Sequence, residues 1–279
     1  MIGVYDSGFG GLTVLRQLRV RLPAYDFLYL GDSGRAPYGG RDPHTLLDFA
    51  EQCTERLFDE GCRLVVVACN TISCVALRHL QRRYAGAGSD RRILGVSIPS
   101  AELAVRVSEG HIGVLATART VASGTYVQEI GKLGSHRVSQ RAAPLLCPIV
   151  EEGLEASALA RLAVAHYVAD LPHVDTLLLA CTHFPLLADA FAATSPVRVL
   201  DPTPFVAERL VDWLARHPGF AAPGAGRLRI ACTGDPDAFR AHGARFLGAP
   251  LPELEHLDAE AGRLAPREDS RDLRGQIVR

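Results

Sequence analysis

Two cysteines each stand at the end of an apolar, β-rich run of residues. Residues 64–68 (Leu-Val-Val-Val-Ala) lead into Cys69, and residues 177–180 (Leu-Leu-Leu-Ala) lead into Cys181. A helix is expected to follow each run, and a thiol at a helix N-terminus has a pKa lowered from about 8.5. Two such thiols could remove a proton from one face of a carbon and add one to the other face. The pattern predicts a racemase that needs no cofactor.

The other reading of a buried cysteine is a small residue of the hydrophobic core. The matched strand-end positions favour chemistry for Cys69 and Cys181, whereas the remaining cysteines lack this context and are interpreted as core residues. These are Cys53, Cys62, Cys74, Cys147 and Cys232. No C-x-x-C pair supports a thiol redox protein, and no Cys/His spacing matches a zinc site, so no metal is predicted.

Two glycine-containing turns follow predicted strands and offer further polar groups. Asp6 and Ser7 precede a Gly-rich segment that opens a helix, whose free N–H groups could hold a carboxylate. The alternative is an ordinary turn with Asp6 as the N-cap. After the second strand, Asp32 and Tyr38 could face a ligand, or could belong to a simple Pro/Gly turn.

Proton-relay candidates lie near the second thiol in sequence or follow a Pro-rich loop. His183 comes two residues after Cys181 and could exchange protons with it, although a solvent-facing histidine at a helix start is the alternative. Glu151 and Glu152 follow residues 142–150. They could serve the site or could be exposed first-turn carboxylates favoured by the helix dipole.

Composition excludes several function classes. The 279 residues are 48% hydrophobic with a formal net charge of −1, which gives no electrostatic case for nucleic acid or an acidic membrane surface. The only lysine, Lys132, lies in a Gly-containing loop, which disfavours a Schiff-base cofactor such as pyridoxal phosphate. No apolar run is long enough to span a bilayer, and residues 2–5 form a predicted strand rather than a signal peptide. Seven cysteines without a dense framework predict reduced thiols and a cytoplasmic location.

Short apolar runs alternate with longer amphipathic stretches, which predicts parallel sheets in an α/β fold. Strands are expected at 2–5, 27–30, 64–68, 93–96, 112–116, 176–180, 197–200 and 228–232. Helices are expected near 12–21, 44–60, 72–84, 101–109, 119–131, 157–171, 204–216 and 236–246. We expect a first domain at 1–96 plus 205–253 and a second at 97–204. Residues 254–279 are expected to be a charged tail, either a short helix or disordered.

With these motifs in place, the chain resembles the glutamate racemases of the cofactor-independent aspartate/glutamate racemase superfamily over about residues 2–235. The resemblance rests on ordered motifs: 6–14, Gly31-Asp32 with Pro37-Tyr38-Gly39, 68–71, 112–117 with Thr120, Ser123 and Tyr126, 150–153, 180–187 and 233–235. Ala143 departs from the family pattern, because many relatives carry a cysteine there.

The resemblance implies two parallel-sheet α/β domains related by pseudo-two-fold symmetry, with the site in the cleft between them. It implies that Cys69 acts on the α-hydrogen of D-glutamate and Cys181 on that of L-glutamate. Asp6 would assist Cys69, and His183 and Glu151 would assist Cys181. The amino acid would be held by Ser7, Pro37, Tyr38, Gly39, Asn70, Thr71, Thr117 and Thr182. No cofactor is implied, and the D-glutamate would enter peptidoglycan.

Three questions stay open: the activity, the oligomeric state and the working carboxylate. The chain could be an aspartate racemase or a related isomerase of the same superfamily, or a non-catalytic amino-acid-binding protein. The oligomeric state is undetermined, with a homodimer as one option. The sequence does not distinguish Glu151 from Glu152 as the working carboxylate.

Overall fold

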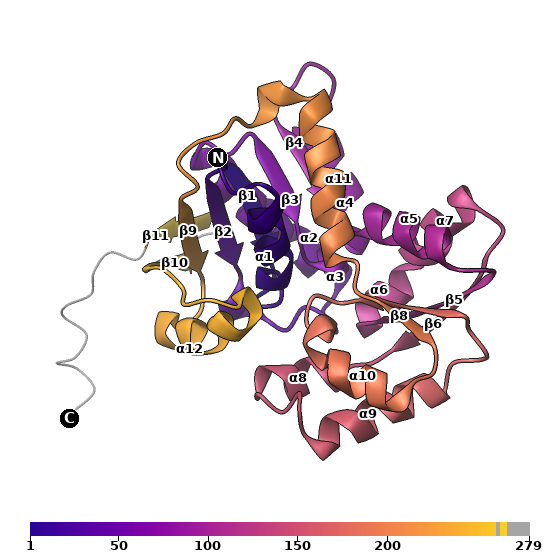
Figure 1. Ribbon diagram of the computed structural model, residues 1–279. Helices are drawn as coiled ribbons and strands as arrows, with labels where there is room; N and C mark the ends of the chain where they lie inside the picture. The colour runs from indigo at the N-terminus through magenta and orange to yellow at the C-terminus, as the bar shows by residue number, and fades with distance from the viewer. Residues whose placement is uncertain (261–262, 267–279) are drawn as a thin grey trace, which may run out of the picture.

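The computed structural model describes residues 1–260 and 263–266, which fold into two α/β units lying side by side (Figure 1). Within these residues, the first unit contains a seven-stranded sheet in the order β11-β10-β9-β2-β1-β3-β4. The second contains a four-stranded sheet in the order β6-β5-β7-β8. All strand pairs are parallel except β10 with β11. The prediction of two parallel-sheet α/β units is confirmed, although the two sheets differ in size.

The strands of the first sheet are β1 (Ile2–Asp6), β2 (Phe27–Gly31), β3 (Leu64–Val67), β4 (Arg92–Gly95), β9 (Leu228–Cys232), β10 (Leu254–Glu260) and β11 (Arg263–Pro266). Those of the second are β5 (His111–Ala116), β6 (Arg137–Ala142), β7 (Thr176–Ala180) and β8 (Arg198–Leu200). The chain passes to the second unit after β4 and returns after β8. All strands of the second sheet lie between residues 97 and 204, and the boundaries of the two domains stay a prediction.

The helices are α1 (Leu12–Arg21), α2 (Pro43–Asp59), α3 (Asn70–Val75), α4 (Leu77–Tyr84), α5 (Ser97–Val107), α6 (Ala118–Ser123), α7 (Thr125–Leu133), α8 (Leu146–Glu151), α9 (Ala158–Ala169), α10 (Ala188–Thr194), α11 (Thr203–Arg216) and α12 (Pro236–Leu247). Short 3-10 turns are η1 (Ser33–Arg35), η2 (Phe184–Leu187) and η3 (Pro218–Phe220). The helix expected near 119–131 is divided into α6 and α7 at Gly124, whose φ of 65° lies in the left-handed region.

Both faces of the first sheet are covered, which explains the continuous apolar strands. Along β1 the side chains alternate between two cores: Val4 packs with the residues of α1, α11 and α12, whereas Tyr5 packs with those of α2 and α4. This alternation is the period-2 geometry of a strand buried on both sides. The core around Val4 continues into the second unit and includes Cys181, so one apolar core joins the two units.

The expectation for residues from 254 onward is wrong where the structure describes them. Residues 254–260 and 263–266 are strands, and β10 pairs with β9. Leu257 and Leu264 are buried against the first sheet's core, and Glu255 forms ion pairs with Arg56 and Arg229. Charged residues of this segment therefore form ion pairs with neighbouring elements. Because of these charged residues, the segment lacks the apolar run that identifies a strand in the sequence. Residues 267–279 lie outside the described residues.

Among the helices of the described chain, none combines the length and the apolar character needed to cross a membrane.

Candidate active site

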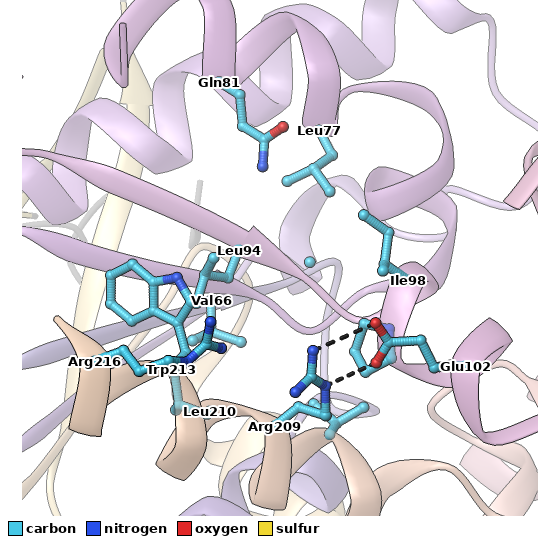
Figure 2. Close-up of a pocket in the computed structure, with 13 residues that line it drawn as sticks. Val66, Leu77, Gln81, Leu94, Ile98, Glu102, Arg209, Leu210, Trp213 and Arg216 are labelled. Atoms are coloured by element: carbon cyan, nitrogen blue, oxygen red, sulfur yellow. Dashed lines mark hydrogen bonds and ion pairs between the residues drawn. The ribbon is translucent and has the colours of Figure 1, made fainter. Parts of the chain in front are cut away.

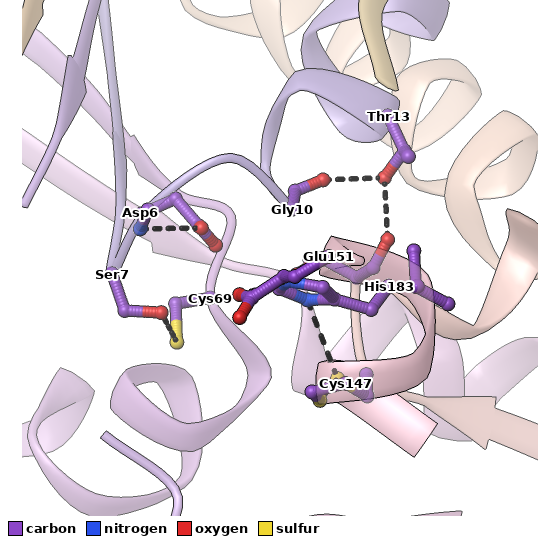
Figure 3. A network of polar contacts seen from close by, with 12 residues as sticks. Asp6, Ser7, Gly10, Thr13, Cys69, Cys147, Glu151 and His183 are labelled. Atoms are coloured by element: carbon purple, nitrogen blue, oxygen red, sulfur yellow. Dashed lines mark hydrogen bonds and ion pairs between the residues drawn. The ribbon is translucent and has the colours of Figure 1, made fainter. Parts of the chain in front are cut away.

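The two thiols lie at the carboxyl ends of parallel strands, where open α/β sheets bind their ligands. Cys69 follows β3 and immediately precedes α3, and Cys181 follows β7 just before η2. Both are nearly inaccessible, with 4% and 7% of their surface exposed. Figure 3 shows the junction between the units: Asp6, Ser7 and Cys69 come from the first unit, and His183, Glu151 and Cys147 from the second.

The surroundings of Cys69 favour the protonated thiol. Burial, together with the negative charge of Asp6, raises the pKa of Cys69 to about 12. The Sγ atom donates to Oγ of Ser7 at 3.6 Å. The expected lowering of this pKa by the helix N-terminus is therefore wrong, because desolvation of the thiolate outweighs the dipole of one short helix.

Asp6 is itself buried and has one carboxylate oxygen to spare. Its Oδ2 accepts the N–H of Gly8 at 3.0 Å, and its Oδ1 has no hydrogen-bond partner. Burial raises the pKa of Asp6 to about 6, although the nearby His183 lowers it in part. An orphaned buried oxygen costs about 1–3 kcal/mol, so this atom is suited to accept a proton or an ammonium group.

The surroundings of Cys181 favour the thiolate. Its Sγ lies 3.5 Å from Sγ of Cys147 and 3.9 Å from Nδ1 of His183. The hydrogen bond from Cys147, then the hydrogen bond and charge of His183, lower the pKa of Cys181 to about 5 against the opposing effect of burial. The direction predicted for this thiol holds, but its neighbours rather than the helix terminus are the main cause.

His183 is held between the thiol and a carboxylate. Its Nε2 lies 2.9 Å from Oε1 of Glu151. Burial would lower the pKa of this histidine, but the contacts with Cys181 and Glu151 outweigh it and raise the pKa to about 10. Of the two neighbouring carboxylates, Glu151 contacts His183, whereas Glu152 is exposed.

Cys147 is the residue near the site that the sequence-based interpretation missed. Its signal was present, because Cys147 and Glu151 are four residues apart on α8 and so lie on one face of that helix. The sequence-based interpretation began the helix at the glutamates, so it did not place Cys147 on the same helix as Glu151. Burial and the hydrogen bond to Cys181 raise the pKa of the Cys147 thiol, with the hydrogen bond as the larger cause.

Several predicted binding residues lie at the contact between the units. The Oγ1 atoms of Thr71 and Thr117 are 3.0 Å apart, and the hydroxyl of Tyr126 donates to Oδ1 of Asn70. The carbonyl of Thr182 accepts from Oγ1 of Thr13 at 3.1 Å. These contacts fix the two thiol-bearing segments relative to each other.

The contact between the units is close at Gly10. A Cβ atom at this position would lie 2.2 Å from Oγ1 of Thr182 and 2.6 Å from Nδ1 of His183. Only glycine lets the loop after β1 approach the Cys181 segment at this distance.

The side chains of Asp32 and Tyr38 are engaged within the first unit. The buried Asp32 carboxylate pairs with Arg35 at 2.8 Å, accepts from Oγ1 of Thr233 at 2.6 Å, and accepts from the hydroxyl of Tyr38. These contacts hold both side chains within the first unit, and a role of either in binding a ligand stays a prediction. The backbone of 37–39 still reaches the second unit, since the carbonyl of Gly39 accepts the N–H of Arg119 at 2.9 Å.

A separate cavity lies between α4, β4, α5 and α11 (Figure 2). It is lined by Leu77, Leu94, Ile98 and Trp213, with the ion pair of Arg209 and Glu102 at 2.7 Å on its wall. Neither Cys69 nor Cys181 lines it.

Comparison with known proteins identifies the family. A model of the Asp/Glu/Hydantoin racemase family matches residues 13–210. The glutamate racemase of Roseobacter denitrificans is 37% identical over 262 residues, which cover 88% of this chain and 96% of that protein. The glutamate racemase of Persephonella marina is 40% identical over 198 residues, which cover 70% and 74% of the two chains.

Solved structures show the same fold. Glutamate racemase from Francisella tularensis, in complex with D-glutamate, superposes with a TM-score of 0.85 at 29% identity and covers 93% of this chain and 98% of that one. Glutamate racemase from Thermus thermophilus, in complex with β-chloro-D-alanine, has a TM-score of 0.83 at 37% identity, with 93% and 97% covered. The chain belongs to the Asp/Glu/Hydantoin racemase family and is an amino-acid racemase.

Proposed function

We propose that this chain interconverts L- and D-glutamate by transferring protons between two cysteines, Cys69 and Cys181, without a cofactor. The relatives named glutamate racemases match most of the chain and support the substrate. The observation that carries the mechanism is geometric: two buried thiols follow β3 and β7 where the two units meet, with Ser7 beside Cys69, and Cys147 and His183 beside Cys181. These surroundings raise the pKa of Cys69 and lower that of Cys181. In peptidoglycan-building bacteria the D-glutamate formed is a cell-wall precursor.

At neutral pH the thiolate of Cys181 and the thiol of Cys69 are the protonation states that the reaction of L-glutamate requires. The Cys181 thiolate removes the α-proton, and the electron pair of the C–H bond stays on the substrate as a carbanion delocalised into its carboxylate. The Cys69 thiol then delivers its proton to the opposite face of the α-carbon. D-glutamate, a Cys69 thiolate and a Cys181 thiol result, and the same steps run backwards from D-glutamate.

The helpers of each thiol match its task. The His183 imidazolium, held by Glu151 at 2.9 Å, stabilises the Cys181 thiolate that begins the reaction. Asp6 lies near Cys69, and its unpartnered Oδ1 can accept a hydrogen bond or a proton from the ammonium group of the substrate. Two oppositely tuned groups around one reacting atom are typical of an acid–base pair.

The carbanion needs hydrogen-bond donors already in place around the substrate carboxylate. We assign this role to polar groups of both units near the thiols: Ser7, Asn70, Thr71, Thr117 and Thr182, with the backbone N–H groups of Tyr38 and Gly39 at the edge. Pro37 has no N–H, so we assign it only a van der Waals contact with the substrate. A Schiff base is disfavoured, because the only lysine of the sequence, Lys132, is exposed and pairs with Glu129 at 2.8 Å. The expectation that Lys132 lies in a loop is wrong, since it lies in the last turn of α7.

The test is incubation with L-glutamate in heavy water. We expect loss of optical rotation and deuterium at the α-carbon of the D-glutamate formed, seen as loss of the α-proton signal in the NMR spectrum. A parallel assay with L-aspartate separates the proposal from an aspartate racemase. Faster racemisation of aspartate than of glutamate, or binding of glutamate without exchange of its α-proton, would contradict the proposal.

A cytoplasmic location and a homodimeric state stay predictions. Seven free cysteines support a reducing compartment. Light scattering coupled to size-exclusion chromatography measures the assembly, and cell fractionation measures the location.

A further inference from the structure

Cys147, Cys181 and His183 form a group of metal-ligand atoms within the second unit. The two Sγ atoms and Nδ1 of the histidine all lie within 4.8 Å of one another. In residues 1–260 and 263–266 this is the one group of three or more cysteine, histidine or acidic side chains with ligand atoms gathered in this way. Both thiols are free rather than joined in a disulfide.

The spacing of the three atoms fits a tetrahedral zinc ion. With Zn–S near 2.3 Å and Zn–N near 2.0–2.1 Å, a tetrahedron separates two sulfurs by about 3.8 Å, and a sulfur from a nitrogen by about 3.6 Å. The Cys147 and Cys181 sulfurs are 3.5 Å apart, and Sγ of Cys181 is 3.9 Å from Nδ1 of His183. Each of these two distances differs from the ideal by about 0.3 Å, and the third pair, Sγ of Cys147 and Nδ1 of His183, lies within 4.8 Å, so rotations of the side chains can bring the three atoms around one ion.

The hydrogen bond on the far side of the histidine supports the same interpretation. Oε1 of Glu151 lies 2.9 Å from Nε2 of His183, so the carboxylate can hold the proton on Nε2 and leave the lone pair of Nδ1 directed at the two sulfurs. A carboxylate behind the ligating histidine is the usual second-shell arrangement of zinc sites. Cys147 and Glu151 both come from α8, so one helix supplies a ligand and the group that orients another ligand.

We propose that Cys147, Cys181 and His183 bind Zn²⁺, and that the bound ion inhibits racemisation by occupying the sulfur of Cys181. The inhibition rests on the proposed function, in which that sulfur is the base for L-glutamate, whereas the binding does not. Three protein ligands leave the fourth position open to water or to a carboxylate of the amino acid. A sulfur that donates its electron pair to zinc cannot accept the α-proton.

The binding test uses the full chain, stripped with a chelator and kept reduced with a phosphine. Co²⁺ is added as a spectroscopic substitute for zinc. We expect one ion per chain with a thiolate-to-cobalt charge-transfer band and the intense visible bands of tetrahedral cobalt. Competition by Zn²⁺ then gives the zinc affinity. Cys147→Val should weaken Zn²⁺ at least 10-fold and reduce the charge-transfer band, while Cys74→Ala, which removes a thiol outside the group, should change neither.

The inhibition test measures glutamate racemisation with and without Zn²⁺, each variant relative to its own zinc-free rate. We expect wild type and Cys74→Ala to be inhibited at the same zinc concentration and restored by chelator, and Cys147→Val to need at least 10-fold more zinc. Equal zinc affinity in wild type and Cys147→Val, or a cobalt spectrum without thiolate bands, would overturn the site. Zinc binding with the predicted spectrum in a chain that never racemises glutamate would instead overturn the proposed function.

Discussion

The Nδ1 atom of His183 lies 3.9 Å from the sulfur of Cys181, in a part of the chain where only one residue separates the two. This contact is made possible by the turn between β7 and η2, which brings both side chains to the same side of the backbone. The pKa of Cys181 falls and that of His183 rises, so each group stabilises the charged form of the other.

Replacement of His183 should therefore act through the thiol. In His183→Asn the Cys181 thiolate loses its cationic neighbour, so we expect kcat/KM for L-glutamate at pH 7 to fall about 100-fold. The acid limb of the pH profile should move to higher pH, because the pKa of Cys181 rises. Glu151→Gln keeps an acceptor for Nε2 but removes the charge, and should give a smaller change of the same direction. An unchanged acid limb in His183→Asn would show that the histidine does not tune the thiol.

The pH dependence of the wild type follows from the two groups that form the charged pair. The thiolate of Cys181 exists above about pH 5 and the imidazolium of His183 below about pH 10. We expect kcat/KM to fall as pH drops toward 5, where the base becomes protonated, and to fall again above 10, where the cation is lost. Asp6, with a pKa of about 6, titrates within the acid limb.

Since the enantiomers have equal free energy, the profiles measured from L- and from D-glutamate should coincide. Initial rates from both enantiomers between pH 4.5 and 10.5 check this. A rate that rises continuously to pH 10 would indicate that a thiol with an ordinary pKa, rather than the Cys181 thiolate, is the base.

Removing one thiol at a time should separate exchange from inversion. In Cys69→Ser the Cys181 thiolate can still remove the α-proton of L-glutamate and return a solvent proton to the same face. We expect deuterium to enter L-glutamate in heavy water while racemisation falls 10²- to 10⁴-fold. In Cys181→Ser, exchange should be confined to D-glutamate. Proton NMR measures exchange and polarimetry measures inversion, and exchange of the same enantiomer in both variants would reverse the assignment of faces.

Gly10 should tolerate no side chain, because its Cβ position is occupied by atoms of the other unit. In Gly10→Ala the methyl group would force Thr182 and His183 away from the first unit. A displacement of about 1 Å at a reacting group costs about 100-fold in rate, so we expect kcat to fall by this order. Gly131→Ala, in the last turn of α7 with no atom within 4 Å of the added methyl, is the matched control and should retain activity.

The network around Asp32 should affect stability. Asp32→Asn removes the charge that pairs with Arg35 while preserving shape, and breaking a buried pair costs about 3–5 kcal/mol. Urea unfolding should show a lower free energy of unfolding by this order, or somewhat less because Arg35 is partly exposed. A variant with wild-type stability would show that the network contributes little.

The sequence by itself determined most of the strands and the placement of the two thiols at strand ends. Continuous apolar runs such as 64–67 and 176–180 predict strands covered on both faces, and both strands are present in the structure. Strands of this kind are recognisable in a sequence because burial on both faces requires apolar residues at every position. The strands at 137–142 and 254–260 escaped prediction. The first is an edge strand with polar, half-buried residues, and the second, between β9 and β11, carries charged residues such as Glu255 that pair with neighbouring elements.

Only the tertiary structure decided how the thiols differ. Both cysteines precede a helical turn, so the sequence predicts the same lowered pKa for both. Desolvation and Asp6 raise the pKa of Cys69, whereas Cys147 and His183 lower that of Cys181. The position of Cys147 beside Cys181 likewise depends on how α8 packs beside η2. A pKa depends on burial and on charges within a few ångströms, and residues distant in sequence bring those charges to the site.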